Sequence, residues 1–261
     1  MSSVQLALRS LGFFFWIMIV SILGILVLPF RWGDRNLDRD YARVFSWLAL
    51  KIASVRVFIQ KDGKALSRAE VAQTLEAHQP CVYVANHQSG LDMAIFGSLC
   101  PSRTVVTGKK ELMYIPFFGL FYVGAGNILL NRQKSSSAIA ALKDAAGRMQ
   151  KENLSVWMFP EGTRNKEGRG LLPFKKGPFH LAIAGQVPIV PIIASSLAEV
   201  ANWQSKGFSG GDVRMEIMAP IPTQGMTEAD VLKLSDRVRA QMLAALDRVN
   251  QWKPDGKPYA Q

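Results

Sequence analysis

Two short segments carry side chains that are suited to proton transfer and to anion binding. Residues 86–92 have the sequence Asn-His-Gln-Ser-Gly-Leu-Asp, so His87 and Asp92 lie five residues apart just after an apolar run. Residues 159–164 have the sequence Phe-Pro-Glu-Gly-Thr-Arg and follow a second apolar run. An imidazole near a carboxylate is typical of a general base with its orienting acid, and an arginine can clamp an anion. The sequence therefore predicts a proton-transfer site with a separate anion clamp.

The spacing around His87 predicts how the base is oriented. Residues 81–85 are predicted to form a strand, so His87 follows its carboxyl end, where α/β sheets bind ligands. With Ser89 as a helix N-cap, Asp92 falls in the first helical turn and can accept the Nδ1–H of His87. No Gly-x-Ser-x-Gly segment supplies a nucleophile. The substrate's own hydroxyl is therefore expected to attack in a direct acyl transfer, although the same dyad could activate water in a hydrolase.

The second segment and one more arginine are the candidate phosphate ligands. Gly162 lets the backbone approach a ligand, and Arg164 can hold phosphate in a bidentate fork. Glu161 cannot hold phosphate, so it is expected to pin the turn or to bond an arginine or a ligand hydroxyl. Arg132 ends a predicted strand over residues 128–130 and is a second candidate, with a solvated surface charge as the alternative.

The N-terminus is suited to a membrane. Residues 10–30 contain no charge, and a helix of this length matches a bilayer core. Arg9 alone precedes the run, whereas four arginines follow it closely, so the positive-inside rule places the main domain in the cytoplasm. A second helix with an apolar stripe at Val44, Trp47, Leu48, Ile52 and Val55 is too polar to span. A single span, or a helical pair that dips into one leaflet, both fit the pattern.

Composition limits the class of protein. The chain of 261 residues can bury a core, and its 31 basic and 20 acidic residues give a net charge of +11, which suits an acidic partner. The basic residues form no patch with interleaved aromatics, which argues against nucleic acid. Cys81 and Cys100 are expected to be buried free thiols, and no Cys/His spacing indicates a metal site.

The remaining pattern predicts the architecture. Strands are expected over residues 55–59, 81–85, 104–107, 128–130, 154–159, 187–194 and 213–218. Helices are expected from Ser67, over 135–150, from near Pro178 and from Thr227, and their alternation with strands predicts an α/β domain with a mainly parallel sheet flanked by helices. The prolines at 188 and 191 suggest a short or edge strand. The expected parts are N-terminal membrane helices (1–54), the α/β domain (55–252) and a loose tail (253–261).

These residues resemble the glycerolipid acyltransferase family, which includes bacterial 1-acyl-sn-glycerol-3-phosphate acyltransferases. Four blocks occur in the family's order: 86–92 (His-x4-Asp), 126–132 (Gly-x-Ile-x-x-x-Arg), 159–164 (Phe-Pro-Glu-Gly-Thr-Arg) and 187–191 (Val-Pro-Ile-x-Pro). The resemblance covers roughly residues 80–195, and its first and third blocks are the specific ones. Asn131 departs from the aspartate that is frequent in the family, which weakens the expected contacts near Arg132.

The resemblance implies roles for named residues. His87 would be the base and Asp92 its partner. The glycerol phosphate would be held by Arg132, Glu161, Gly162, Thr163 and Arg164. The acyl-binding region would be lined by Val187, Pro188, Ile189 and Pro191. An α/β fold and an N-terminal helical pair that docks to the membrane are also implied.

The expected reaction moves an acyl chain from acyl carrier protein or coenzyme A to the 2-hydroxyl of 1-acylglycerol 3-phosphate, which gives phosphatidic acid. No cofactor or metal is expected. The resemblance and the apolar N-terminus place the enzyme at a bacterial-type cytoplasmic membrane, with its catalytic domain on the cytoplasmic face. Another lysolipid, such as lyso-ornithine lipid or a lysophospholipid, is the alternative acceptor. A thioesterase or lipid hydrolase and a non-catalytic lipid-binding protein are the other classes.

Overall fold

The computed structural model describes residues 3–131, 135–167, 170–198, 200–202, 207–254 and 257–260. The strands are β1 (Val55–Lys61), β2 (Lys64–Ala65), β3 (Val82–Ala85), β4 (Thr104–Lys109), β5 (Ile128–Leu130), β6 (Ser155–Met158), β7 (Ile189–Ala194), β8 (Ala201–Asn202), β9 (Gly207–Phe208) and β10 (Gly211–Ile217). The α-helices are α1 (Ser3–Val27), α2 (Leu37–Ala53), α3 (Arg68–Glu76), α4 (Asp92–Gly97), α5 (Phe118–Gly124), α6 (Ser135–Glu152), α7 (Gly177–Gly185) and α8 (Val231–Gln251). The 3-10 turns are η1 (Leu28–Arg31), η2 (Lys110–Tyr114) and η3 (Glu228–Asp230).

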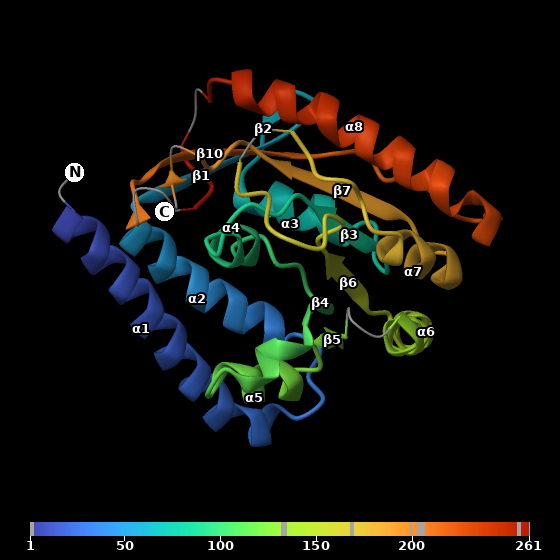
Figure 1. Cartoon of the computed structure of the whole chain (residues 1–261), viewed down its shortest axis with the longest axis horizontal. Helices are drawn as coiled ribbons and strands as arrows, with labels where there is room; N and C mark the ends of the chain where they lie inside the picture. The colour runs from blue at the N-terminus through green and yellow to red at the C-terminus, as the bar shows by residue number, and fades with distance from the viewer. Residues whose placement is uncertain are drawn as a thin grey trace.

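A mixed eight-stranded sheet forms the centre of the molecule, in the order β2-β1-β10-β7-β3-β6-β4-β5 (Figure 1). The five strands from β7 to β5 are parallel to one another, and β10 runs antiparallel to β7. The predicted class, a mainly parallel sheet flanked by helices, is confirmed. In the register of β3 and β6, Val84 faces Met158, so the residues that follow both strands emerge at one edge of the sheet.

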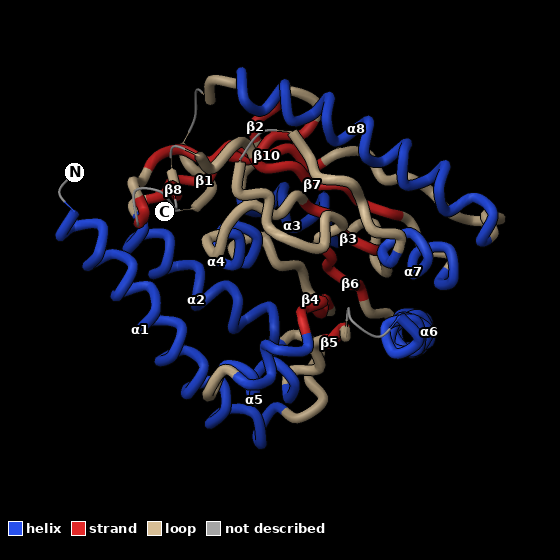
Figure 2. The backbone as a smooth tube through the Cα atoms, in the orientation of Figure 1, coloured by secondary structure: helices blue, strands red, loops and turns tan. Residues whose placement is uncertain are grey.

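Helices cover both faces of this sheet (Figure 2). Alternate residues of β3 divide between two core clusters, since strand side chains point to opposite faces. Tyr83 packs with residues of α2, α3 and α4, whereas Val84 packs with residues of α6, α7 and α8. The strands are therefore buried on both faces, which explains why their sequences are continuously apolar.

The prediction of a short or edge strand at residues 187–194 is wrong. β7 lies between β10 and β3, and all six of its residues are buried. Pro191 is tolerated there because the ladder to β10 ends at the pair Ile217–Ile192. Pro191 lies just beyond that pair, where no backbone N–H is needed for the ladder to β10. Its carbonyl accepts the backbone N–H of Met218.

The N-terminal helices pack along the α/β domain. Along α1, the Arg9 guanidinium donates to the carbonyl of Phe208, and the Trp16 indole donates to the carbonyl of Phe45 at 2.8 Å. Near the other end, a Cβ on Gly24 would lie 2.5 Å from the Phe121 ring, so α1 and α5 are in close contact. Among the described residues, one helix is long and apolar enough to cross a membrane, Val4–Arg31.

The predicted apolar stripe of α2 is only partly buried. Val44 and Trp47 are exposed, and Leu48 and Ile52 are partly exposed. The buried face instead carries Phe45, Ala49, Leu50 and Ala53. α2 has apolar residues on both sides because it faces the core on one side and α1 on another, where Gly12 approaches Ile52.

The last helix follows the predicted pattern, but the chain end does not. Thr227 and Asp230 form the expected capping box, and α8 buries its predicted apolar stripe. Residues 257–260 are not a loose tail, since Ala260 is buried and pairs with Val57 of β1. A short apolar contact at the sheet edge therefore holds this part of the chain.

Candidate active site

The His87 side chain is fixed by Asp92 at the carboxyl edge of β3. The Nδ1 atom of His87 lies 2.6 Å from Oδ2 of Asp92, whose residue is 1% exposed. The same oxygen accepts the backbone N–H groups of Gln88 at 2.6 Å and Ser89 at 2.9 Å. The oxygen that receives these two backbone N–H bonds acts as an acceptor, so Nδ1 of His87 donates to it. The Nε2 atom is thereby left to accept a proton.

The predicted N-cap at Ser89 is wrong, although the geometry it was meant to explain is present. The helix α4 begins at Asp92, and the Ser89 hydroxyl accepts the N–H of Leu91 instead. The Asp92 carboxylate closes the loop by turning back to the amides that precede it. The N-terminus of α4 thus has no side-chain cap, and the Asp92 carboxylate binds the loop before the helix.

Glu161 joins the two sequence segments. Its Oε1 accepts the N–H of His87 and its Oε2 accepts the N–H of Leu172, both at 2.8 Å. The His87 carbonyl in turn accepts the N–H of Asn165 at 2.7 Å. Burial raises the pKa of Glu161, and the two backbone donors oppose that shift. With its residue 1% exposed, Glu161 pins the turn against the His87 loop, in agreement with the first of its expected roles.

The anion-binding candidates lie on the same side as His87. Gly162, Thr163 and Arg164 line one cavity together with His87 and Asp92. Gly162 has φ of 70°, in the region that favours glycine, and a Cβ there would lie 3.0 Å from the side chain of Lys175. The Arg164 guanidinium comes within 3.9 Å of the position of a Cβ on Gly90, so it faces the His87 loop. Arg132 lies outside the described residues.

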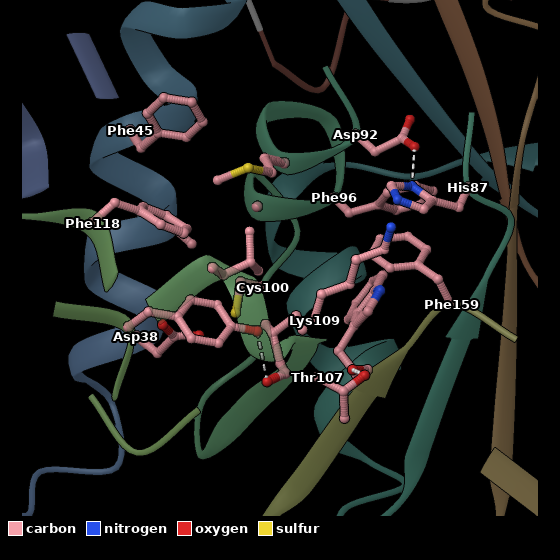
Figure 3. Close-up of a pocket in the computed structure, with 18 of the residues that line it drawn as sticks. Asp38, Phe45, His87, Asp92, Phe96, Cys100, Thr107, Lys109, Phe118 and Phe159 are labelled. Atoms are coloured by element: carbon pink, nitrogen blue, oxygen red, sulfur yellow. Dashed lines mark hydrogen bonds and ion pairs between the residues drawn. The ribbon is translucent and has the colours of Figure 1, made fainter. Parts of the chain in front are cut away.

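The cavity has a volume of about 490 Å³ and a polar end beside His87 (Figure 3). We call polar end the group of His87, Asp92, Lys109, Thr163, Arg164 and Lys166. We call apolar wall the group of Phe45, Met93, Phe96, Leu112, Phe118, Phe121 and Trp157. In Figure 3, Asp38 lies across the cavity from His87, and its carboxylate accepts the Asn127 side-chain N–H at 2.7 Å. Burial raises the pKa of Asp38 to about 6.

The residues expected to line the acyl region are elsewhere. Val187 and Ile189 are buried in the core cluster between the sheet and the helices α7 and α8. The carbonyl of Pro188 accepts the N–H of Val82, and Pro191 lies inside the sheet. None of the four lines the cavity, whose wall comes from α2, α4, α5, β4 and β6. The structure therefore gives them a supporting position in the core.

Three residues at the cavity were missed by the sequence analysis. Lys109 ends β4 and, in Figure 3, extends toward His87 and Phe159. The Phe159 ring stacks on the His87 ring with centroids 4.3 Å apart. Lys166 lines the cavity two residues after Arg164. Lys109 could have been found, because it ends a strand at the same sheet edge, but the predicted strand stopped at Thr107.

The thiols match their expectation, although Cys100 also lines the cavity and Cys81 does not. Cys81 and Cys100 are free and buried, and burial raises the pKa of Cys81 to about 12. Within the described ranges, no three His, Cys, Asp or Glu side chains are grouped so that they could hold a metal ion. The acidic and basic side chains that line the cavity are thus those of the polar end and Asp38.

Comparisons with known proteins identify the family of this chain. A family model described as Acyltransferase matches residues 67–195. The human 1-acyl-sn-glycerol-3-phosphate acyltransferase beta is 40% identical over 85% of this chain and 77% of its own length. The 1-acyl-sn-glycerol-3-phosphate acyltransferase of Haemophilus influenzae is 41% identical over 76% of this chain and 75% of its own.

A solved structure shares the fold. The crystal structure of the 1-acyl-sn-glycerophosphate acyltransferase PlsC from Thermotoga maritima matches with a TM-score of 0.75 and 22% identity. The match covers 97% of this chain and 100% of that one, so the N-terminal helices are part of the shared fold. From the sequence relatives, the chain belongs to the 1-acyl-sn-glycerol-3-phosphate acyltransferase family and is an acyltransferase.

Proposed function

We propose that this acyltransferase moves an acyl chain from the thioester of acyl carrier protein or coenzyme A to the 2-hydroxyl of 1-acylglycerol 3-phosphate. The names of its relatives support the acceptor. The observation that carries the proposal is one cavity with three features. A His–Asp pair and the cations Lys109 and Arg164 lie at its polar end, and aromatic and aliphatic side chains form most of the rest of its lining. That combination suits an anionic head group attached to acyl chains.

The proposed chemistry needs no covalent acyl-enzyme. The Nε2 atom of His87 takes the proton of the acceptor hydroxyl while the hydroxyl oxygen attacks the thioester carbonyl carbon. A C–O bond forms, the C–S bond breaks, and the thiolate leaves with the proton that His87 returns. Asp92 stabilises the imidazolium between these two transfers, since its Oδ2 already holds Nδ1.

The phosphate of the acceptor is proposed to lie at the turn of residues 162–164. Arg164 offers two parallel N–H donors to phosphate oxygens, and the left-handed Gly162 keeps the backbone free of a side chain there. Lys109 adds a point charge from the neighbouring strand. Thr163 and Arg132 remain proposed ligands, and Glu161 contributes by holding the turn. The acyl chain is proposed to lie along the apolar wall.

The enzyme is proposed to work at a membrane surface on its cytoplasmic face. α1 contacts the α/β domain from Arg9 to Gly24, so most of its length is bound to that domain. A helix bound along its length to the domain favours one of the two interpretations, a helical pair that dips into one leaflet, and disfavours a single transmembrane span. Both candidate donors are acidic and water-soluble, which fits the net charge of +11.

A lysolipid panel tests the proposed acceptor. Purified protein would receive a labelled acyl donor and, in parallel, lysophosphatidic acid, lyso-ornithine lipid and lysophosphatidylcholine. Transfer is expected to be fastest to lysophosphatidic acid, because it alone offers an unshielded phosphate to Arg164. If it were the poorest acceptor, the proposal would fail. Donor consumption without any acceptor would instead indicate a hydrolase.

A further inference from the structure

The segment from η2 to α5 is apolar on two opposite sides. Its inner side supplies Leu112, Phe118, Phe121 and Tyr122 to the cavity. Its outer side exposes Met113, Tyr114, Ile115, Phe117, Leu120 and Val123. Tyr114 is 72% exposed and Leu120 is 64% exposed. A helical segment that is hydrophobic all round is one that is covered on every side, and nothing in the described chain covers the outer side of this one.

The backbone at this segment is strained in a way that leaves an aromatic ring exposed. Phe117 has φ of 60°, and the N–H of Phe118 donates to the carbonyl of Pro116 at 2.6 Å. A γ-turn with a positive φ at a bulky residue is rare. The neighbouring Gly119 is required here, since a Cβ on it would lie 2.2 Å from the carbonyl oxygen of Met113. The strain gains no burial for Phe117 among the described residues, which favours a partner outside the chain.

The outer side of this segment continues the exposed face of α1. Gly124 of α5 meets Leu28, and Gly24 of α1 meets Phe121, so the two helices lie side by side (Figure 1). Beyond that contact, α1 and the turn after it expose large apolar side chains: Leu23, Leu26, Val27, Phe30 and Trp32. Lys110 begins the segment and is exposed, with Glu111 beside it. Apolar and aromatic surface with a basic residue at its rim is typical of a membrane interface.

We propose that the outer side of the η2–α5 segment is embedded in a phospholipid bilayer next to α1, and that lipid passes between the bilayer and the cavity along this segment. The inference rests on the proposed function in one respect, because it takes the cavity as the acyl site. A bilayer is favoured over a second protein copy because one short segment supplies side chains both to the cavity wall and to the exposed surface. A lipid can move from one to the other around a single short helix.

A fluorescent label tests the embedding directly. Leu120→Cys would carry an environment-sensitive dye, and Leu232→Cys, at an exposed leucine on α8, would be the matched control. Vesicles of phosphatidylethanolamine with phosphatidylglycerol are expected to shift the emission at position 120 to the blue and to leave position 232 unchanged. An unchanged emission at 120, in protein that sediments with the vesicles, would overturn the inference. A blue shift at 120 before vesicles are added would also overturn it, since it would indicate a protein partner.

An activity comparison tests the passage of lipid. The double variant Leu120→Lys, Val123→Lys would be compared with Leu232→Lys on two acceptors, long-chain lysophosphatidic acid in vesicles and a water-soluble short-chain analogue. The acyl-transfer rate of the double variant is expected to fall roughly tenfold or more with the acceptor in vesicles. With the soluble acceptor it should fall less than about twofold, because the introduced charges are costly only inside the bilayer. Equal losses on both acceptors, or no loss on vesicles, would overturn the inference. If the parent enzyme acylated neither acceptor, the proposed function would fail, while the dye experiment would still decide the embedding.

Discussion

The polar end of the cavity and its apolar wall are held in place by different kinds of contact. At the polar end, Asp92 and Glu161 accept four backbone N–H bonds between them, and each carboxylate fixes the loop of His87. The apolar wall has side chains from α2, α4, η2, α5 and β6 that meet by packing. Hydrogen bonds impose a narrow geometry, whereas packed aromatic side chains tolerate change of shape. The first region is therefore suited to chemistry and the second to selecting and admitting acyl chains.

The largest effect on activity is expected when the general base at the polar end is removed. His87→Ala is expected to lower turnover by about 10²- to 10⁴-fold, the contribution typical of a positioned general base. Binding to vesicles should be unchanged, because α1 and α5 are untouched. Initial rates with labelled donor and lysophosphatidic acid would measure the loss, with His180→Ala on α7 as the control. A variant that keeps most of the parent rate would remove His87 from the chemistry.

Away from the polar end, the cavity is also lined by the carboxyl group of Asp38, and removing its charge should stabilise the protein. Burial raises the pKa of Asp38 from 3.8 to about 6, so the folded state disfavours the carboxylate and loses stability as pH rises through this range. Asp38→Asn keeps an oxygen acceptor for Asn127 and removes the charge. We expect the free energy of unfolding to increase by up to about 3 kcal/mol at pH 8, from 1.36 kcal/mol per pKa unit.

The pH dependence separates this effect from a general change in packing. The gain from Asp38→Asn should shrink by roughly two thirds between pH 8 and pH 4.5, since the carboxyl protonates in the folded protein first. Asp34 has the opposite sign, because hydrogen bonds from Asn36 and Arg31 lower its pKa. Asp34→Asn should therefore destabilise at neutral pH. Denaturant unfolding in detergent would measure the free energy of unfolding of both variants. An increase for Asp38→Asn that is the same at every pH would contradict the electrostatic explanation.

At the polar end, the acceptor clamp should affect binding more than turnover. Arg164→Ala is expected to raise the KM for lysophosphatidic acid by roughly 10- to 100-fold with a smaller change in kcat, because a charge-assisted hydrogen bond to phosphate is lost. Arg237→Ala, at an exposed position on α8, provides the matched control. Steady-state kinetics with varied acceptor would measure both constants. An unchanged KM would assign Arg164 another role.

The smallest effect on activity is expected when only the size of a side chain that lines the cavity is changed. Ala42 on α2 lines the cavity, and Ala42→Phe should shift preference toward shorter acyl donors by a few-fold, roughly the value of a few methylenes in an apolar pocket. Ile189→Val, in β7 away from the cavity, should leave that preference unchanged. Competition between short and long acyl donors would measure the ratio. A shift at position 189 and none at 42 would restore the sequence-based assignment of the acyl region.

The sequence predicted best where the deciding contacts are local. The capping box at Thr227, the stripe on α8 and the mainly parallel sheet all follow from spacing within one element or from the alternation of elements. The meeting of His87 with Asp92 spans five residues and was also predictable. The prediction failed for β7, because two prolines suggested an edge, whereas the end of the β10 ladder makes room for one of them inside the sheet. For α2 the sequence left the neighbour undecided, because an apolar stripe does not identify the surface against which it packs.

By itself, the sequence determined the chemical groups and their first neighbours: an imidazole, its carboxylate, an arginine turn and an apolar N-terminus. Short spacing fixes these, since a few bonds of backbone leave little freedom. Only the tertiary structure decided that Lys109 extends toward His87, that α5 separates the cavity from an exposed apolar surface, and that residues 187–191 lie in the core. Those facts depend on which distant segments pack together, and packing is set by the shape of the whole core and not by the order of residues along the chain.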